Sequence, residues 1–481
     1  MKKKSIKINI VFNIIRVAIN LMVPMIVFPY VSQILGPDHM GKISFVTAVN
    51  NFFCLFSMLG ISSYGILICS KLKDDTESLK RSVAELIYIN LLLISITYVI
   101  YYFCICCLNH FKPYKELLFI YSLVIFFNAV GMEWLYLALE EFTYITIRTF
   151  IVRSSSVVFI FLLVKNRDDY ITYVWILVIT IIVTNLMNLF HIRSYIKIYN
   201  PFKLAYKKHW ISILIFFSAS FASTISANID TTMLGIWSTD YWVGIYSFSV
   251  KIKTLLVTII SGIVSAALPR LTYNYNNRRL DEYSAVLRKI FILLLIISVG
   301  LTGFFIVEAE DIILLLGGKE YLNGRNSMLI LTASVIVMAV TYTFGVCVLQ
   351  ATGNEKQYAK SIYISCIVNV VVNAVLIPVI GVNGAAFATV ISEVINAILF
   401  INKSNKIVGK WYHDLEILKF VFASVVASFL VYLLNFSFSG MAIIVRILFL
   451  FLVYFLVYIL VLLGIHNESR INIRNAIKNR K

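Results

Sequence analysis

The apolar residues of this chain occur in blocks of about 20, separated by short polar segments. Folded as an α-helix, a block of this length crosses the ~30 Å hydrocarbon core of a bilayer. Fourteen such blocks lie at residues 8–30, 43–68, 83–107, 116–138, 144–164, 170–192, 211–236, 241–268, 289–307, 326–350, 361–380, 383–402, 416–438 and 440–465. Beyond the ninth block, residues 312–316 could form a re-entrant turn. The pattern predicts an all-α polytopic membrane protein with about 14 transmembrane helices.

The first block carries a polar face. Asn9, Asn13, Arg16, Asn20 and Pro24 follow one another at spacings of three or four residues, which places them on one side of a helix. A charge at the centre of a membrane helix costs roughly 2.5–3.5 kcal/mol even on insertion scales. We therefore expect Arg16 and Asn20 to face a polar interior shared with other helices.

Two further blocks carry a polar stripe that contains a cation. The stripe of the eighth block is Ser247, Lys251, Thr254, Thr258, Ser261 and Ser265, and that of the fifth is Thr146, Thr149, Arg153 and Ser156. Lys253 lies about 200° around the helix from Lys251. We expect Lys251 to face the interior and Lys253 to meet another helix or to extend toward the interface. Stripes of Ser and Thr alone are also typical of packing seams.

Acidic residues also occur inside the apolar blocks. Asp230 lies in the seventh block and Glu393 in the twelfth. Ionisable residues within membrane helices often serve as relays, so both are candidates for coupling to a proton or cation gradient. Glu393 could equally be a structural hydrogen-bonding residue. Arg148 and Lys419 lie near block ends and are predicted to snorkel, and Arg446 is predicted to be a lipid-edge or packing residue.

A short motif occurs twice at corresponding places. The sequence Gly-Lys-Ile-Ser-Phe at 41–45 follows Leu35-Gly36, and Gly-Ile-Tyr-Ser-Phe at 244–248 follows Leu234-Gly235. This offset suggests that blocks 1–6 and 7–12 are two copies of one unit, as in many transporters. The predicted organisation is a six-helix lobe at 1–200, a second at 201–410, an extra helix pair at 411–465 and a basic cytoplasmic tail at 466–481.

Composition and charge support a membrane protein and indicate its orientation. The 481 residues are 60% hydrophobic and 14% charged, and the net charge is +18. In alternate loops, 28 Lys and Arg fall on one side of the predicted membrane and seven on the other. Such an asymmetry is the positive-inside signature. It predicts that both termini are cytoplasmic, and it accounts for the basic charge without nucleic-acid binding.

Several classes of protein are disfavoured. The seven cysteines lie in or next to apolar blocks, and Cys104, Cys106 and Cys107 are interpreted as small core residues rather than metal ligands. The first block is too long for a cleavable signal peptide and lacks a small-residue cleavage site. No predicted outside loop exceeds about 18 residues, which argues against a membrane polymerase, ligase or glycosyltransferase. We expect no enzyme, no cofactor and no metal.

The cations within the membrane indicate the charge of a ligand. A cavity lined by Arg16, Arg153 and Lys251, with Asn20 beside them, favours an anion. Guanidinium groups bind phosphate in a bidentate fork. A lipid-linked pyrophosphate fits, because it is multiply negative and carries a group too polar to cross the bilayer unaided.

Motifs along the whole chain resemble one family. They are Phe28-Pro29-Tyr30, Leu35-Gly36-Pro37, Gly41, Leu59-Gly60-Ile61, Tyr64-Gly65, Glu133-Trp134-Leu135-Tyr136, Glu140, Tyr144, Leu316-Gly317, Tyr321, Asn373, Pro378, Gly381, Gly384 and Glu393. In order and spacing they resemble the O-antigen and capsule polysaccharide flippases of the multidrug/oligosaccharidyl-lipid/polysaccharide exporter superfamily. One departure is Leu137-Ala138-Leu139, where many relatives have Gln-Gly before the acidic residue.

The resemblance implies two six-helix lobes around a cationic central cavity, plus two C-terminal helices. It implies alternating access that moves an undecaprenyl-pyrophosphate-linked oligosaccharide across the bacterial inner membrane, and less directly coupling to a proton or cation gradient. Expected partners are this lipid-linked oligosaccharide, membrane lipid, a polysaccharide polymerase and a chain-length regulator, with no nucleic acid. The alternatives are a drug/cation antiporter of the same superfamily, a polymerase or ligase, and a non-transporting scaffold.

Overall fold

The computed structural model describes residues 6–191, 199, 205–409, 417–438 and 440–465. Within these ranges the chain is helical and contains no strand, which confirms the predicted all-α class. The predicted basic tail at 466–481 lies outside the described residues. The side chains of several residues in the first helix, Asn20 among them, lie outside them as well.

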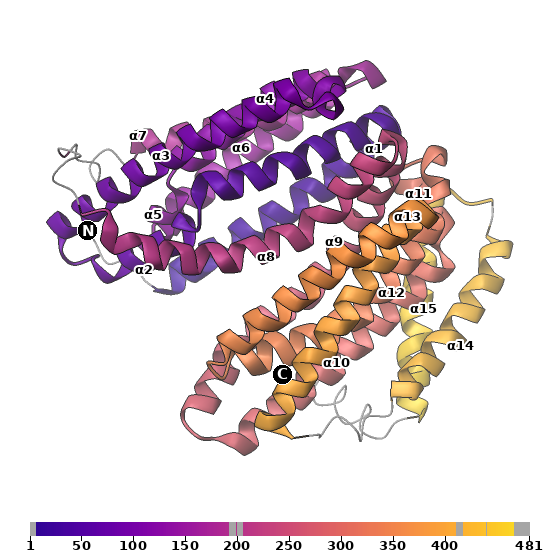
Figure 1. Cartoon of the computed structure of the whole chain (residues 1–481). Coiled ribbons are helices and arrows are strands. Elements are labelled where there is room, and N and C mark those ends of the chain that lie inside the picture. The colour runs from indigo at the N-terminus through magenta and orange to yellow at the C-terminus, as the bar shows by residue number, and fades with distance from the viewer. Residues whose placement is uncertain (1–5, 192–198, 200–204, 410–416, 439, 466–481) are drawn as a thin grey trace. The chain divides into compact units, whose positions relative to one another are not determined.

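The chain forms two compact units, residues 1–244 and 245–481, and each is described by itself. The first unit contains α1 (Ile6–Met58), α2 (Ile61–Lys71), α3 (Thr76–Cys107), η1 (Asn109–Tyr114), α4 (Lys115–Val130), α5 (Glu133–Ala138), α6 (Phe142–Leu163), η2 (Arg167–Asp169), α7 (Tyr170–His191) and α8 (Lys207–Trp237) (Figure 1). In this unit α8 packs against α1 and α2. The predicted lobe boundary after residue 200 stays a prediction.

The second unit begins within α9 (Asp240–Asn276). It continues with α10 (Leu280–Val307), α11 (Ala309–Leu316), η5 (Lys319–Gly324), α12 (Arg325–Thr341), the π-helix η6 (Tyr342–Gln350), α13 (Glu355–Val408), α14 (Ile417–Ser437) and α15 (Ile443–Ile465). The residues beyond the ninth apolar block thus form a short helix, α11. The extra pair, α14 and α15, pack against each other and against α10.

Two helices are much longer than a bilayer requires, and both are broken inside. In α1 the break is at Gly36, whose φ of 69° is open to glycine but strained for other residues. Residues 31–42, which lie between the first two predicted blocks, do not form a loop, because the chain redirects at Gly36 alone and stays helical on both sides. In α13 the break is at Ile380 and Gly381, at the boundary predicted between two blocks.

The number of membrane crossings follows from these breaks. Among the described residues, 12 helical stretches are long and apolar enough to cross a membrane. The two halves of α13 lie alongside each other, since the Ser365 hydroxyl donates to the Ser392 carbonyl at 2.7 Å. If each half of α1 and of α13 crosses once, the total is the predicted fourteen. That count remains a prediction.

The repeated glycine–phenylalanine motif makes the same contact in both places. Phe45 of the first copy packs on Tyr114 of η1, with ring centroids 4.8 Å apart. Phe248 of the second copy packs on Tyr321 of η5 at 4.5 Å. Both tyrosines are buried, and each belongs to a 3₁₀ turn that leads directly into a long helix, α4 or α12. This correspondence supports an internal repeat.

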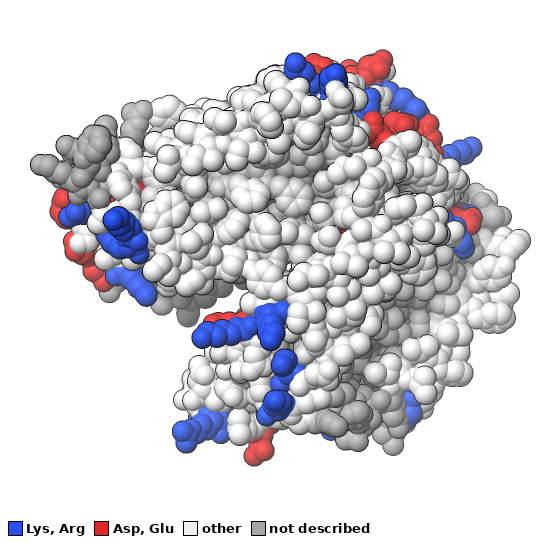
Figure 2. Space-filling model, in the orientation of Figure 1, with Lys and Arg blue, Asp and Glu red and all other residues white. Residues whose placement is uncertain are grey.

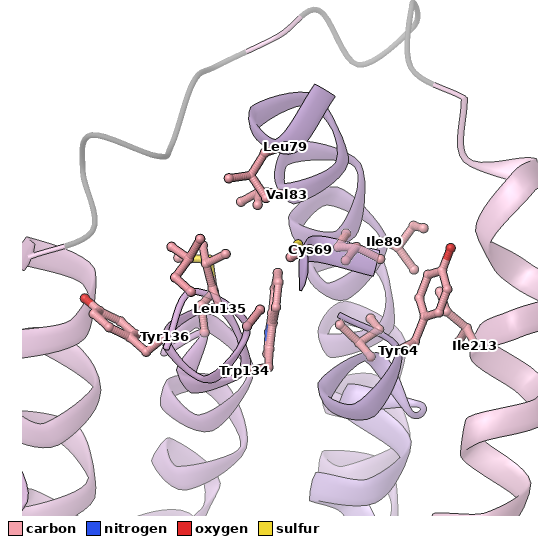
Figure 3. Packing of buried hydrophobic residues seen from close by; sticks show 14 of the residues in the cluster. Tyr64, Cys69, Leu79, Val83, Ile89, Trp134, Leu135, Tyr136 and Ile213 are labelled. Atoms are coloured by element: carbon pink, nitrogen blue, oxygen red, sulfur yellow. The ribbon is translucent and has the colours of Figure 1, made fainter. Parts of the chain in front are cut away.

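Apolar packing holds the predicted cytoplasmic end of the first unit together. Tyr64 of α2, Val83 of α3, Trp134 of α5 and Ile213 of α8 meet in one buried cluster (Figure 3). A Cβ on Gly65 would lie 2.6 Å from the Trp134 ring, so glycine is needed for α5 to approach α2 this closely. These contacts fix the position of α5, the helix that begins with Glu133.

The surface agrees with a membrane environment. On the face of the first unit drawn in Figure 2, charged residues gather toward the helix ends and the surface between them is mostly uncharged. Many large apolar side chains on that unit are exposed, among them Val99, Phe103, Phe150 and Leu162. In water such a surface would aggregate, whereas in a bilayer it contacts lipid.

Candidate substrate site

A break between α4 and α5 builds the site in the first unit. Met132 adopts a left-handed backbone with φ of 45°, a conformation that costs a residue with a side chain roughly 1–2 kcal/mol. The carbonyls released at the break are bonded by amides from neighbouring helices. Asn90 Nδ2 donates to the Ala129 carbonyl at 2.5 Å, and Asn188 Nδ2 donates to the Gly131 carbonyl at 3.0 Å. Such compensation is required where water is absent.

The break brings Glu133 among three arginines. Arg16 Nη1 of α1 lies 3.2 Å from Glu133 Oε1, and Arg148 Nη2 of α6 lies 3.3 Å from Oε2. Arg153, one to two turns further along α6, is within electrostatic range of the same carboxylate. The group has three guanidiniums and one carboxylate, so it carries a net positive charge inside an apolar bundle. We call Arg16, Glu133, Arg148 and Arg153 the arginine cluster.

The side chains of the arginine cluster differ in their exposure, and this determines which of them a ligand can reach. The Arg148 side chain is 2% exposed and the Glu133 side chain is 42% exposed. Arg148 also donates to the Asn188 amide oxygen and to the Thr149 hydroxyl, so its position is fixed from several sides. Arg16 and Arg153 are half-buried. The deep arginine therefore orients the carboxylate, while the other groups lie nearer to the surface of this unit.

The prediction that Arg148 extends its guanidinium toward the interface is wrong. Arg148 lies near the start of its apolar block, which suggested a position at the membrane interface. Its guanidinium instead bonds to Asn188 of α7 and Glu133 of α5, and the local sequence does not predict these partners. Glu133 itself was not predicted as a site residue. The available signal was an acidic residue in an apolar block two positions after Gly131, where a helix break is plausible.

The polar stripe of α6 faces the interior of the first unit. Thr146, Thr149 and Ser156 are buried. The Thr146 hydroxyl donates to the Phe12 carbonyl of α1 at 2.8 Å, which joins the two helices that carry Arg16 and Arg153. The structure therefore brings those two predicted residues around one carboxylate. The position of the Asn20 side chain lies outside the described residues.

In the second unit, a buried ion pair joins α9 to α13. Lys253 Nζ lies 2.5 Å from Glu393 Oε1, and both side chains are largely buried. Lys253 thus meets another helix, one of the two outcomes predicted for it. Lys251 is half-buried on a different side of α9. Four hydroxyls of its stripe, those of Thr254, Thr258, Ser261 and Ser265, donate to carbonyls of their own helix.

The second acidic candidate, Asp230, is buried in α8 of the first unit. Two residues earlier in α8, Asn228 Oδ1 accepts a hydrogen bond from Asn51 Nδ2 of α1 at 2.9 Å. Asp230 therefore lies on a helix that is joined to α1 by polar contacts. Coupling roles for Asp230 and Glu393 stay predictions.

A second charged cluster in the first unit was not predicted. Glu85 of α3 is fully buried, and Lys208 Nζ and His209 Nε2 lie 2.7 and 2.8 Å from its carboxylate. The other ring nitrogen of His209 lies 2.8 Å from the Tyr64 hydroxyl of α2. A cavity of about 550 Å³ opens beside these residues. The cluster joins α2, α3 and α8 at one end of the unit and has a structural role.

Comparison with known proteins places the chain in a family. A family profile described as "Polysaccharide biosynthesis protein" matches residues 6–275, more than half of the chain. The chain belongs to this family. A second profile, MatE, matches residues 215–375. A Shigella dysenteriae protein named as an O-antigen transporter is 23% identical over 408 residues, which cover 80% of this chain and 96% of that protein.

Solved structures establish the same fold for almost the whole chain. The lipid II flippase MurJ in an inward closed conformation gives a TM-score of 0.77 at 17% identity, covering 95% of this chain and 99% of MurJ. A multidrug resistance MATE family transporter in an inward-facing conformation gives 0.67 at 14% identity, covering 82% and 98%. The predicted resemblance to the flippase branch of this superfamily is confirmed.

Proposed function

We propose that the chain is a flippase that moves a lipid-linked oligosaccharide across the membrane by alternating access. The observation that carries this proposal is the arginine cluster, a net positive site inside a bundle that otherwise contacts lipid. Membership of a polysaccharide biosynthesis family and a relative named as an O-antigen transporter support it. The substrate class is an undecaprenyl-pyrophosphate-linked repeat unit.

The arginine cluster suggests how a pyrophosphate binds. Glu133 supplies one carboxylate to Arg16 and Arg148, and a phosphate presents oxygens of similar spacing to a guanidinium fork. Because Glu133 is the most exposed member, an arriving pyrophosphate displaces it from Arg16 while Arg148 retains it. Arg16 and Arg153 then hold the anion. Asn20 and Lys251 are the other two residues that we propose as substrate contacts, from their place on the polar stripes of their helices.

The test replaces Arg16 or Lys251 by alanine in the full chain and measures surface polysaccharide in a deletion host. We expect each variant to lose most complementation at wild-type expression, because a guanidinium or ammonium contact to phosphate is lost. Lys112→Ala, an exposed cation of η1, is the control and retains complementation. Full polysaccharide in both variants would exclude the cationic site.

Further parts of the proposal concern coupling and cellular setting. Asp230 and Glu393 couple substrate movement to a proton or cation gradient. The chain works in the bacterial inner membrane as a transporter without catalytic chemistry, with both termini in the cytoplasm. A polysaccharide polymerase and a chain-length regulator act on the exported product. These assignments rest on the buried Asp230, the largely buried Glu393, the loop charges and the family.

A multidrug antiporter is the second candidate, because the MatE profile covers residues 215–375. Such a protein would bind organic cations, and a net positive cluster repels them. Export of a cationic dye distinguishes the two. Dye efflux that survives Arg16→Ala, without any effect of the chain on polysaccharide, would favour the antiporter.

A further inference from the structure

The second unit holds another group of buried charges, on helices that the Lys253–Glu393 pair does not use. Glu308 directly follows α10 and is 1% exposed. Asp311 lies in the first turn of α11, and Arg446 of α15 pairs with it. Asn435 of α14 donates from Nδ2 to Glu308 Oε1 at 3.3 Å. The group thus joins the α10–α11 junction to both C-terminal helices.

The charges in this group do not balance. Arg446 is engaged by Asp311, and Glu308 Oε2 receives no hydrogen bond from any described residue. Asp311 is near enough to Glu308 to hydrogen-bond with it when one carboxyl is protonated. Two ionised carboxylates cannot bond to each other, because both only accept. One negative charge is therefore in excess at a site shielded from water, which is costly.

The other charged residues around the α10–α11 junction that the structure describes are more exposed than Glu308. Glu310 of α11 is 66% exposed and lies 3.1 Å from Arg325 of α12. Lys319 and Glu320 of η5 are exposed. Within the part of the chain that the structure describes, Asp311 from α11, Asn435 from α14 and Arg446 from α15 are the groups that act on Glu308. A small cation would balance the excess negative charge of this group. A proton is the cation that needs no ligands beyond the two carboxylates.

We propose that Glu308 and Asp311 form a carboxyl pair that binds one proton, held in place by Arg446 and Asn435. The protonated carboxyl donates its O–H to the other carboxylate, and the single remaining charge balances Arg446. Loss of the proton places two carboxylates in repulsion where α10 and α11 meet α14 and α15. The site therefore makes the attachment of the C-terminal helix pair sensitive to pH. It does not depend on the proposed transport function.

The range of pH in which the site acts is set by its surroundings. Burial raises the pKa of Glu308 to about 7, and the neighbouring Asp311 charge is the second largest cause. The Arg446 charge acts in the opposite direction and lowers this pKa. An ordinary Glu has a pKa of about 4.3. Between these values the folded protein binds more protons than the unfolded chain. This contribution to stability is complete below the unfolded pKa and is lost as pH rises through about 7.

Infrared difference spectroscopy on the purified full chain tests the site directly, through the carbonyl stretch of a protonated carboxylic acid. We expect one carboxyl to deprotonate near neutral pH in the wild type, and this signal to be absent in Glu308→Gln. In Asp311→Asn the midpoint moves to lower pH, because a neighbouring negative charge is removed. Glu310→Gln, the exposed neighbour, leaves the signal unchanged. A neutral-pH signal that persists in Glu308→Gln overturns the proposal.

Thermal unfolding in detergent gives an independent readout. The wild type is expected to lose a few degrees of Tm between pH 6 and pH 8, as the buried proton leaves. Glu308→Gln mimics the protonated carboxyl, so its Tm stays level over this range and exceeds that of the wild type at pH 8. A Tm of Glu308→Gln that falls with pH as steeply as the wild type contradicts the proposal.

Discussion

Glu133 sets the charge of the arginine cluster. Its carboxylate bonds to both Arg16 and Arg148, and the left-handed residue before it holds it there. Arg148, at 2% exposure, depends on this counter-charge more than any other member. A buried ion that loses its partner is destabilising, whereas an exposed one is hydrated instead.

We predict that Glu133→Gln lowers the stability of the protein in detergent. Breaking a fully buried pair costs 3–5 kcal/mol, and since Glu133 is partly exposed we expect about 1–2 kcal/mol. The measurement is Tm by tryptophan fluorescence, with Glu140→Gln as the control. Glu140 pairs with Lys73 at an exposed position, where such pairs contribute less than about 1 kcal/mol. Equal Tm values for the two variants would refute this role of Glu133.

At the scale of helices, the functional geometry depends on where helices are interrupted. The α4–α5 break is possible because Asn90 and Asn188 bond the released carbonyls. The break also requires a residue without a side chain at position 131, because α7 lies close to the backbone there. A Cβ on Gly131 would lie 1.8 Å from Asn185 Oδ1, well inside van der Waals contact. The glycine before the break is therefore a packing requirement.

Gly131→Ala is expected to shift α7 or the break and to lower both Tm and surface polysaccharide. Overpacking of this kind typically costs about 1–3 kcal/mol. Gly262→Ala in α9 is the matched control, because no described atom beyond the local helix backbone lies within 4 Å of its added Cβ. That variant should be neutral or more stable by up to about 1 kcal/mol, since alanine favours helix. A Gly131→Ala protein with unchanged Tm would show that the close contact is dispensable.

At the scale of the whole molecule, loop charge predicts the orientation in the membrane. The segment after α3 is predicted to lie outside. Cys106 and Cys107 at the end of that helix are exposed, so their interpretation as core residues is wrong. Cys69, at the end of α2 on the predicted cytoplasmic side, is buried. The chain therefore contains its own reporters of orientation.

A membrane-impermeant maleimide applied to spheroplasts should label the wild type, and the labelling should disappear in a variant with Cys106→Ser and Cys107→Ser. Cys69→Ser should not change it, because that thiol is buried. Labelling confined to inside-out vesicles would reverse the predicted orientation. Labelling after unfolding in SDS gives the measure of total thiol.

The sequence by itself determined the fold class, most helix positions and the existence of buried cations. These follow from local physics, because crossing hydrocarbon requires a long apolar helix and each buried charge stands out against it. The break at Gly381 could also be predicted from the sequence, because glycine accepts the positive φ that redirects α13. The polar stripe with Arg153 and the short motif at Phe45 and Phe248 were visible for the same reason.

Only the tertiary structure decided which charges meet. Arg16 and Arg148 are 117 and 15 residues from Glu133, and Lys253 is 140 residues from Glu393. Helical periodicity gives the face of a residue but not the neighbour it meets, so Arg148 was misplaced. For the same reason the sequence did not predict the role of Glu308. The excess negative charge of its group can be recognised only once α11, α14 and α15 are seen to pack around it. Pairing between distant helices is set by packing of the whole bundle, and no local pattern records it.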